Sequence, residues 1–272
     1  MDSTETRANQ TTSGRTILWN NLVALLLGAA LMVLLHELVH FVTGIAIGYR
    51  STIYSYGVTH DGNPTRSAIA LMAISAPIFS LVVGFAMALW QPLRRVGGFA
   101  QLLWLWLAFA SAQEGVTYFV IAPFGAGDTA TFVREMGWPG WTTIVLCFAG
   151  VGGMFGTARL FATSVKRHAG DNINTMRCMA WYPWLLSLPF AIGTGLLYTA
   201  VAKMALTPGE YFFTMLAGLS TTVFAPMSLI WAARLRVGPE PLVQKPIPIL
   251  GIVGYIAMIV INLSLSWGLT LG

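Results

Sequence analysis

Long apolar stretches, separated by short polar breaks, run through most of the chain. A transmembrane helix needs about 20 predominantly apolar residues, and seven stretches meet this requirement. They are residues 17–47, 67–90, 99–122, 141–164, 180–203, 210–233 and 248–270. The pattern therefore predicts an all-α polytopic membrane protein with about seven transmembrane helices.

Two segments depart from this pattern. The first sixteen residues are polar and rich in Thr and Ser, and predict a disordered N-terminal tail (1–16). The apolar run that follows continues without a clear cleavage site, so we expect a retained helix rather than a signal peptide. Ser51–His60 (STIYSYGVTH) is β-branched, aromatic and too short to span. It predicts a short β-hairpin between the first two helices, with an ordinary loop as the alternative.

Composition supports the membrane interpretation. The chain is 56% hydrophobic and only 9% charged, whereas a soluble domain usually has about a quarter of its residues charged. The net charge of +5 is explained by Lys and Arg in loops that stay inside, so no nucleic-acid partner is expected. Cys147 and Cys178 have no metal-binding spacing and are expected to be small buried or interfacial thiols.

The distribution of Lys and Arg predicts an orientation. With the N-terminus inside, the inner segments hold Arg7, Arg15, Arg94, Arg95, Lys166, Arg167, Arg177, Arg234, Arg236 and Lys245. The outer segments then hold Arg50, Arg66, Arg134 and Lys203. Cytoplasmic loops carry an excess of cations, so this distribution favours an N-terminus inside the cell.

The chemistry-bearing motif is His36-Glu37-Leu38-Val39-His40, in the first predicted helix. Residues four apart on a helix are about 40° apart around the axis and about 6 Å apart along it, so the two imidazoles can share one ion. Glu37 is the expected general base that takes a proton from the attacking water. Ionisable groups are costly inside a membrane and usually mark function there. The motif therefore predicts a zinc-dependent hydrolase.

Two histidines leave room for a third protein ligand. Within reach of the bilayer the candidates are Asp128 and Glu114, which belong to the third helix or its end. That helix runs in the same direction as the first, so its C-terminal part lies on the side of His36 and His40. Glu114 could instead orient a histidine ligand or bond to a neighbouring helix. His60 and Asp61, in the loop after the first helix, are interpreted as a solvated loop pair, with a spare metal ligand as the alternative.

The motif resembles that of the site-2 protease family, the M50 intramembrane metalloproteases. That family has HExxH on one helix, a Gly-Pro element on the next, and an Asp ligand after a Pro near the end of the third. Here Ser75-Ala76-Pro77 is similar to the second element, and Pro123 followed by Asp128 keeps the spacing of the third. The resemblance implies that Asp128 is the third zinc ligand and Glu37 the catalytic base.

The resemblance has limits along the chain. It covers residues 17–135, a metalloprotease-like core, and assigns no role to the additional helices of 136–272. The family's Asn before the Pro is Val120 here, so its substrate-positioning role falls to Gln113 or Glu114 as candidates. The family also leads us to expect a site near the cytosolic face, whereas the charge distribution puts it nearer the outer face.

The expected function is hydrolysis of peptide bonds in or near transmembrane segments of membrane-protein substrates, in a bacterial cell membrane. The substrate segment must be locally unwound, and Ser51–His60 could present a strand edge to hold it extended. Two alternatives stay open. One is a membrane-embedded zinc hydrolase of lipid-linked substrates, and the other is a non-catalytic membrane protein that binds metal for sensing or transport.

Overall fold

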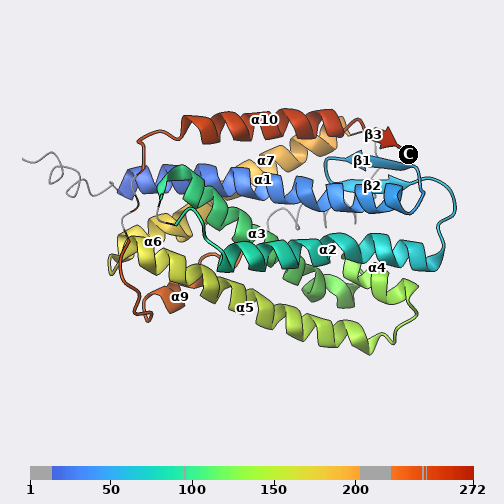
Figure 1. The fold of residues 1–272 in the computed structure, drawn as a ribbon, viewed down its shortest axis with the longest axis horizontal. Coiled ribbons are helices and arrows are strands. Elements are labelled where there is room, and N and C mark those ends of the chain that lie inside the picture. The colour runs from blue at the N-terminus through green and yellow to red at the C-terminus, as the bar shows by residue number, and fades with distance from the viewer. Residues whose placement is uncertain (1–13, 95, 203–221, 241, 243) are drawn as a thin grey trace, which may run out of the picture.

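The computed structural model describes residues 14–94, 96–202, 222–240, 242 and 244–272. Within these residues the chain is mostly helical, and five segments are helical, long and apolar enough to cross a membrane. The long helices in them are α1 (Gly14–Ala46), α2 (Arg66–Leu89), α3 (Gly98–Ile121), α5 (Trp141–Ala169) and α7 (Trp181–Val201). They form an elongated bundle (Figure 1). This architecture is compatible with the expected helical membrane protein.

Five shorter helical elements complete the described structure, and one of them, α10, runs along the bundle beside α1 (Figure 1). They are the 3-10 helix η1 (Ala122–Phe124), α4 (Gly127–Glu135), α6 (Ile173–Met179), α9 (Ser228–Ala232) and α10 (Ile249–Leu265). Of the expected span 210–233, residues 210–221 lie outside the described residues, and the described part contains α9. The apolar helix α10 has 17 residues. The number of seven crossings therefore stays a prediction.

Helix boundaries differ from the apolar pattern where polar residues extend a helix. Helix α1 begins at Gly14, within the tail predicted for 1–16, and residues 1–13 lie outside the described residues. Helix α5 continues to Ala169, beyond the predicted end at 164. It stops at Gly170, whose φ of 59° suits a glycine cap. Hydropathy alone does not predict the polar ends of helices that extend beyond the hydrocarbon.

A small sheet lies beside the C-terminal end of α1. Strands β1 (Ser51–Tyr54) and β2 (Gly57–His60) form an antiparallel hairpin, so the predicted hairpin is confirmed. A third strand, β3 (Leu269–Leu271), pairs antiparallel with the other edge of β1. Figure 1 shows the C-terminus at the hairpin, at the opposite end of the bundle from the start of α1. The apolar pattern predicts a helix over 248–270, and its uniform hydrophobicity could not reveal the change to a strand.

Glycines bring the helices around α3 into close contact. A Cβ on Gly84 of α2 would lie 2.3 Å from the backbone nitrogen of Ala112 on α3. A Cβ on Gly28 of α1 would lie 3.1 Å from the backbone nitrogen of Leu107, also on α3. Small residues at such contacts let helix backbones approach in a membrane. Helix α3 is therefore held tightly between α1 and α2, the two helices that flank the site described below.

The interior and exterior of the bundle have the character expected in a bilayer. Trp106 of α3 is fully buried and donates a hydrogen bond to Oδ1 of Asn21 on α1 at 3.0 Å. Large apolar side chains face outward, among them Phe148 of α5 at 76% exposure and Leu250 of α10 at 86%. Lipid tails can cover such side chains at no cost, whereas water cannot.

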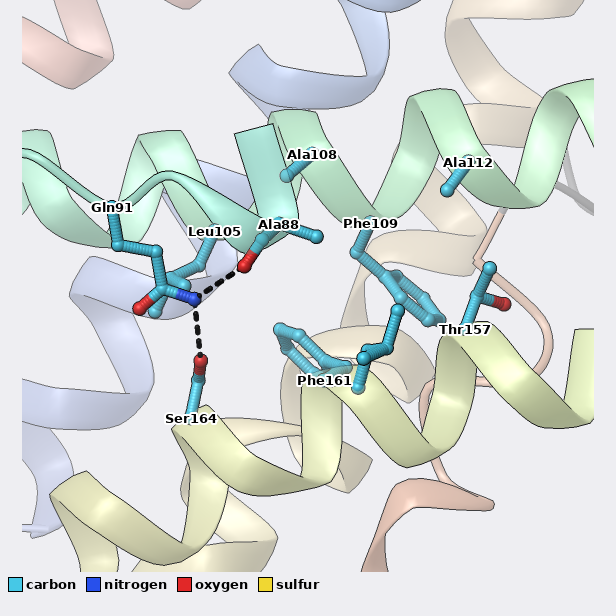
Figure 2. Close-up of a pocket in the computed structure, with 10 residues that line it drawn as sticks. Ala88, Gln91, Leu105, Ala108, Phe109, Ala112, Thr157, Phe161 and Ser164 are labelled. Carbon is cyan, nitrogen blue, oxygen red and sulfur yellow. Dashed lines mark hydrogen bonds between the residues drawn. The ribbon is translucent and has the colours of Figure 1, made fainter. Parts of the chain in front are cut away.

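A small cavity lies among α2, α3 and α5 (Figure 2). Gln91, just after α2, donates hydrogen bonds to the Ala88 carbonyl at 2.9 Å and to Oγ of Ser164 at 3.4 Å. The volume of this cavity, about 20 Å³, suits a single water molecule. None of its lining residues is charged, so we assign it no chemistry.

Candidate metal centre

Helix α1 presents His36 and His40 one turn apart on its buried face. Both are almost fully buried, at 3% and 8% exposure. Their Nε2 atoms lie 3.0 Å apart, so the two rings point at the same spot. This is the arrangement that the spacing of four residues predicts.

Asp128 reaches these rings from the first turn of α4. Its Oδ2 atom lies 3.2 Å from Nε2 of His36 and 3.0 Å from Nε2 of His40. The chain arrives there through a turn with positive φ at Gly125 (72°) and Gly127 (77°), a conformation that glycine adopts at little cost. Burial acts to raise the pKa of Asp128, but the charge and hydrogen-bond interactions with His40 and His36 together outweigh burial and hold the net pKa well below its usual range. The side chain is therefore an anionic donor.

The three donor atoms fit a zinc ion. Protein zinc sites bind imidazole nitrogen and carboxylate oxygen at about 2.0–2.2 Å in tetrahedral geometry, which separates neighbouring donor atoms by about 3.3 Å. The separations here are 3.0, 3.0 and 3.2 Å. Among the described residues, no other group of three His, Cys, Asp or Glu side chains comes together in this way.

The second nitrogen of each ring is fixed by another element. Nδ1 of His40 donates a hydrogen bond to the carbonyl oxygen of Met72 on α2 at 2.7 Å. Oε1 of Glu114 on α3 approaches Nδ1 of His36 to 2.6 Å, from off the N–H axis. Protons on Nδ1 leave Nε2 of each ring free to bind a metal. Of the two candidate third ligands, Asp128 thus joins the histidine Nε2 atoms, whereas Glu114 lies behind one ring.

A cavity of about 410 Å³ opens onto these donors. Its lining includes His36, His40 and Asp128, and also Glu37, the predicted general base. Glu37 is partly exposed, in contrast to the two buried histidines. The expected base and the expected ligands therefore face one space.

Tyr118 is a site residue that the sequence does not indicate. Its ring stacks on that of His36, with centroids 5.1 Å apart and planes at 2°. Tyr118 lines the same cavity as Asp128. A Cβ on Gly127 would lie 2.8 Å from Cδ1 of this ring. The available signal is spacing: Tyr118 lies one helical turn after Glu114 and on the same face of α3.

Two other expectations change. His60 does not form a solvated pair with Asp61. The side chain of His60 lines the cavity, whereas Oδ2 of Asp61 lies 3.8 Å from Nε of exposed Arg50. Gln113, a candidate for the family's substrate-positioning Asn, points away and donates to Thr157 and to the Met154 carbonyl on α5. Neither outcome could be deduced from spacing along the chain.

Comparison of the chain with known proteins identifies no similar protein. No family model matches the chain, and no curated protein or solved structure is significantly similar to it. The resemblance to site-2 proteases therefore stays a prediction based on the motif residues.

Proposed function

We propose that this chain is a membrane-embedded zinc metallopeptidase that hydrolyses peptide bonds in or near transmembrane segments of other proteins. The observation that carries the proposal is the convergence of His36, His40 and Asp128 in a cavity that Glu37 also lines. Two histidines and one carboxylate are a ligand set of catalytic zinc sites, which keep one position open for water or substrate.

Each of the surrounding side chains has a defined task in this mechanism. When bound, zinc supplies Lewis acidity, which lowers the pKa of water and polarises a carbonyl group. Glu37 takes a proton from the attacking water and returns it to the leaving nitrogen. Glu114 and the Met72 carbonyl hold the ligand rings in orientation, since metal-binding histidines need a partner at the second nitrogen.

Among the described residues, no strand pairs with the edge of β2 opposite β1, and this edge favours a peptide substrate over a lipid. The backbone N–H of Asp61 donates to the Arg50 carbonyl at 2.8 Å, which makes these residues a hydrogen-bonded pair. Such pairs alternate along an antiparallel ladder. The backbone groups of Val58 and His60 therefore point away from β1, on the edge that lines the cavity. An extended peptide can add to such an edge as a further strand.

Charge supports an orientation with the metal centre near the outer face. Among the described residues, the bundle end at which α1 begins carries Arg15, Arg94, Lys166, Arg167, Arg177, Arg234, Arg236 and Lys245. The end that holds the hairpin and α4 carries Arg50, Arg66 and Arg134, each within 4.0 Å of a carboxylate. Cation-rich loops stay in the cytoplasm, so the cavity would open on the outer side.

The function is tested with purified protein and an unfolded protein such as casein as the probe. Wild type is expected to contain about one zinc per chain and to cleave the probe. Glu37→Gln should keep the zinc and abolish cleavage, because the amide cannot take a proton. Cleavage that survives this change would show that the assigned base is wrong.

The strand edge has its own matched pair of variants. Val58→Pro removes an N–H that points to the cavity and leaves the ladder to β1 intact, so it should slow cleavage without loss of zinc. Arg50→Ala, at the exposed start of the hairpin, should leave cleavage unchanged. Equal rates for Val58→Pro and wild type would contradict the role of this edge.

A further inference from the structure

His60 occupies a position between the strand edge and the metal centre. Its side chain packs on Gly44 of α1, where an added Cβ would lie 2.5 Å from both Nδ1 and Cε1 of the imidazole. Gly44 follows His40 by one helical turn, so these two residues share one face of α1. A side chain at position 44 would displace the ring. The helix thus leaves space for an imidazole beside the metal ligands.

The contacts of the Ser51 hydroxyl favour a proton on Nδ1 of His60. The Ser51 hydroxyl has one proton, and both of its contacts are satisfied together only if that proton goes to the carbonyl oxygen of Tyr49, 3.1 Å away. The contact of 2.8 Å between Ser51 Oγ and Nδ1 of His60 is therefore donated by the imidazole. Nε2 then carries a lone pair, and it makes no hydrogen bond within the part of the chain that the structure describes.

The surroundings favour this neutral form of the ring. Burial lowers the pKa of His60. The neighbouring carboxylate of Asp61 is turned to exposed Arg50 and does not pair with the imidazole. The imidazole of His60 therefore lines a cavity whose other polar side chains are the metal donors, Glu37 and hydroxyls.

We propose that Nε2 of His60 accepts a hydrogen bond from a backbone N–H of the bound peptide and so fixes the peptide between β2 and the metal centre. This inference rests on the proposed function and names a substrate-binding residue for it. A lone pair suits a peptide N–H, because an extended chain placed along the edge of β2 presents N–H groups on both of its sides. A lipid ester has no such donor.

The test measures binding of three zinc-directed probes to the full-length zinc-loaded protein in detergent. Acetohydroxamate reports on the metal alone. An apolar peptide hydroxamate adds backbone N–H groups, and its N-methylated form lacks them. His60→Phe keeps a ring on Gly44 and removes the acceptor, whereas His60→Gln restores an acceptor near the same position. Thr59→Ala, on the exposed face of the same strand, is the matched control.

We expect His60→Phe to bind acetohydroxamate within twofold of wild type and the peptide hydroxamate about tenfold more weakly, the effect of one lost hydrogen bond. The N-methylated probe should bind both proteins equally, and His60→Gln should recover part of the loss. Ser51→Ala, which frees the ring without changing its size, should weaken the same peptide probe and serves if His60→Phe does not fold.

The outcomes separate this inference from the proposed function. If His60→Phe and Ser51→Ala bind the peptide hydroxamate as tightly as wild type, or if the methylated probe is weakened equally, His60 is not the acceptor. If wild type fails to bind acetohydroxamate, or binds the peptide probe no better, the zinc peptidase assignment itself fails.

Discussion

Glu114 and Asp128 contact opposite edges of one imidazole. Oε1 of Glu114 lies 2.6 Å from Nδ1 of His36, and Oδ2 of Asp128 lies 3.2 Å from its Nε2. The two acids that the sequence offers as alternative third ligands therefore have different tasks in the proposed site. Asp128 lies on the side of the metal position, and Glu114 polarises the His36 ring from its Nδ1 side.

Replacing Glu114 with Gln should weaken zinc binding without abolishing it. The amide keeps the size of the side chain but removes the negative charge next to Nδ1 of His36, and partners of this kind are worth about 10–100-fold in metal affinity. Competition with a zinc chelator measures the effect. Glu240→Gln, in an exposed ion pair with Arg94, is the control and should bind zinc as wild type does. Loss of all zinc in Glu114→Gln would instead make Glu114 a direct ligand.

The Tyr118→Phe variant should alter the metal environment through Asp128. Loss of the hydroxyl removes a hydrogen-bonding group from the cavity that Asp128 also lines, while the ring still stacks on His36. We expect zinc affinity to fall about tenfold and the visible spectrum of the cobalt-substituted protein to shift. Tyr182→Phe, at the start of α7, should change neither quantity. An unchanged cobalt spectrum in Tyr118→Phe would show that the hydroxyl does not position Asp128.

Close packing of α2 on α3 predicts an asymmetry between two glycine substitutions. Gly84→Ala places a methyl group 2.3 Å from the backbone nitrogen of Ala112 and must push the helices apart, which typically costs about 1–3 kcal/mol. A Cβ on Gly152 of α5 meets nothing within 4 Å, so Gly152→Ala should cost no stability. Thermal unfolding in detergent compares the two variants. Equal unfolding temperatures would contradict the tight α2–α3 contact.

The orientation is tested by labelling in intact cells. With Cys147 and Cys178 changed to Ser, single cysteines replace exposed Thr59 in the hairpin or exposed Asn174 in α6. A membrane-impermeant maleimide should label the first and not the second, because the cation-rich end is expected to stay in the cytoplasm. Labelling of Asn174→Cys alone would place the metal centre at the cytoplasmic face, as the resemblance to site-2 proteases implies.

The sequence could predict those parts of the fold and site that follow from local patterns. Hydropathy marks the long helices, because a span must be apolar over a fixed length. The spacing of His36 and His40 predicts their shared face, because a helix turns every 3.6 residues. The β-branched run Ser51–His60 predicts the hairpin that the structure contains.

Features that depend on contacts between distant segments could not be predicted in this way. Strand β3 pairs with β1 from more than 200 residues away, and nothing in its apolar sequence distinguishes it from helix. The ring of Tyr118 is positioned by its stack on His36. The ring of His60 is positioned by the space that Gly44 leaves on α1. Such roles arise from tertiary packing, which single-sequence periodicity does not encode.

The central claim is that His36, His40 and Asp128 hold one zinc ion. X-ray absorption at the zinc edge of the purified, zinc-loaded protein tests it most directly, with Asp128→Ala as the comparison. We expect two imidazole ligands and oxygen donors at about 2.0–2.2 Å in wild type, and a shell that changes in Asp128→Ala while both imidazoles stay. A wild-type protein without bound zinc, or a shell that lacks the two imidazoles, would contradict this assignment.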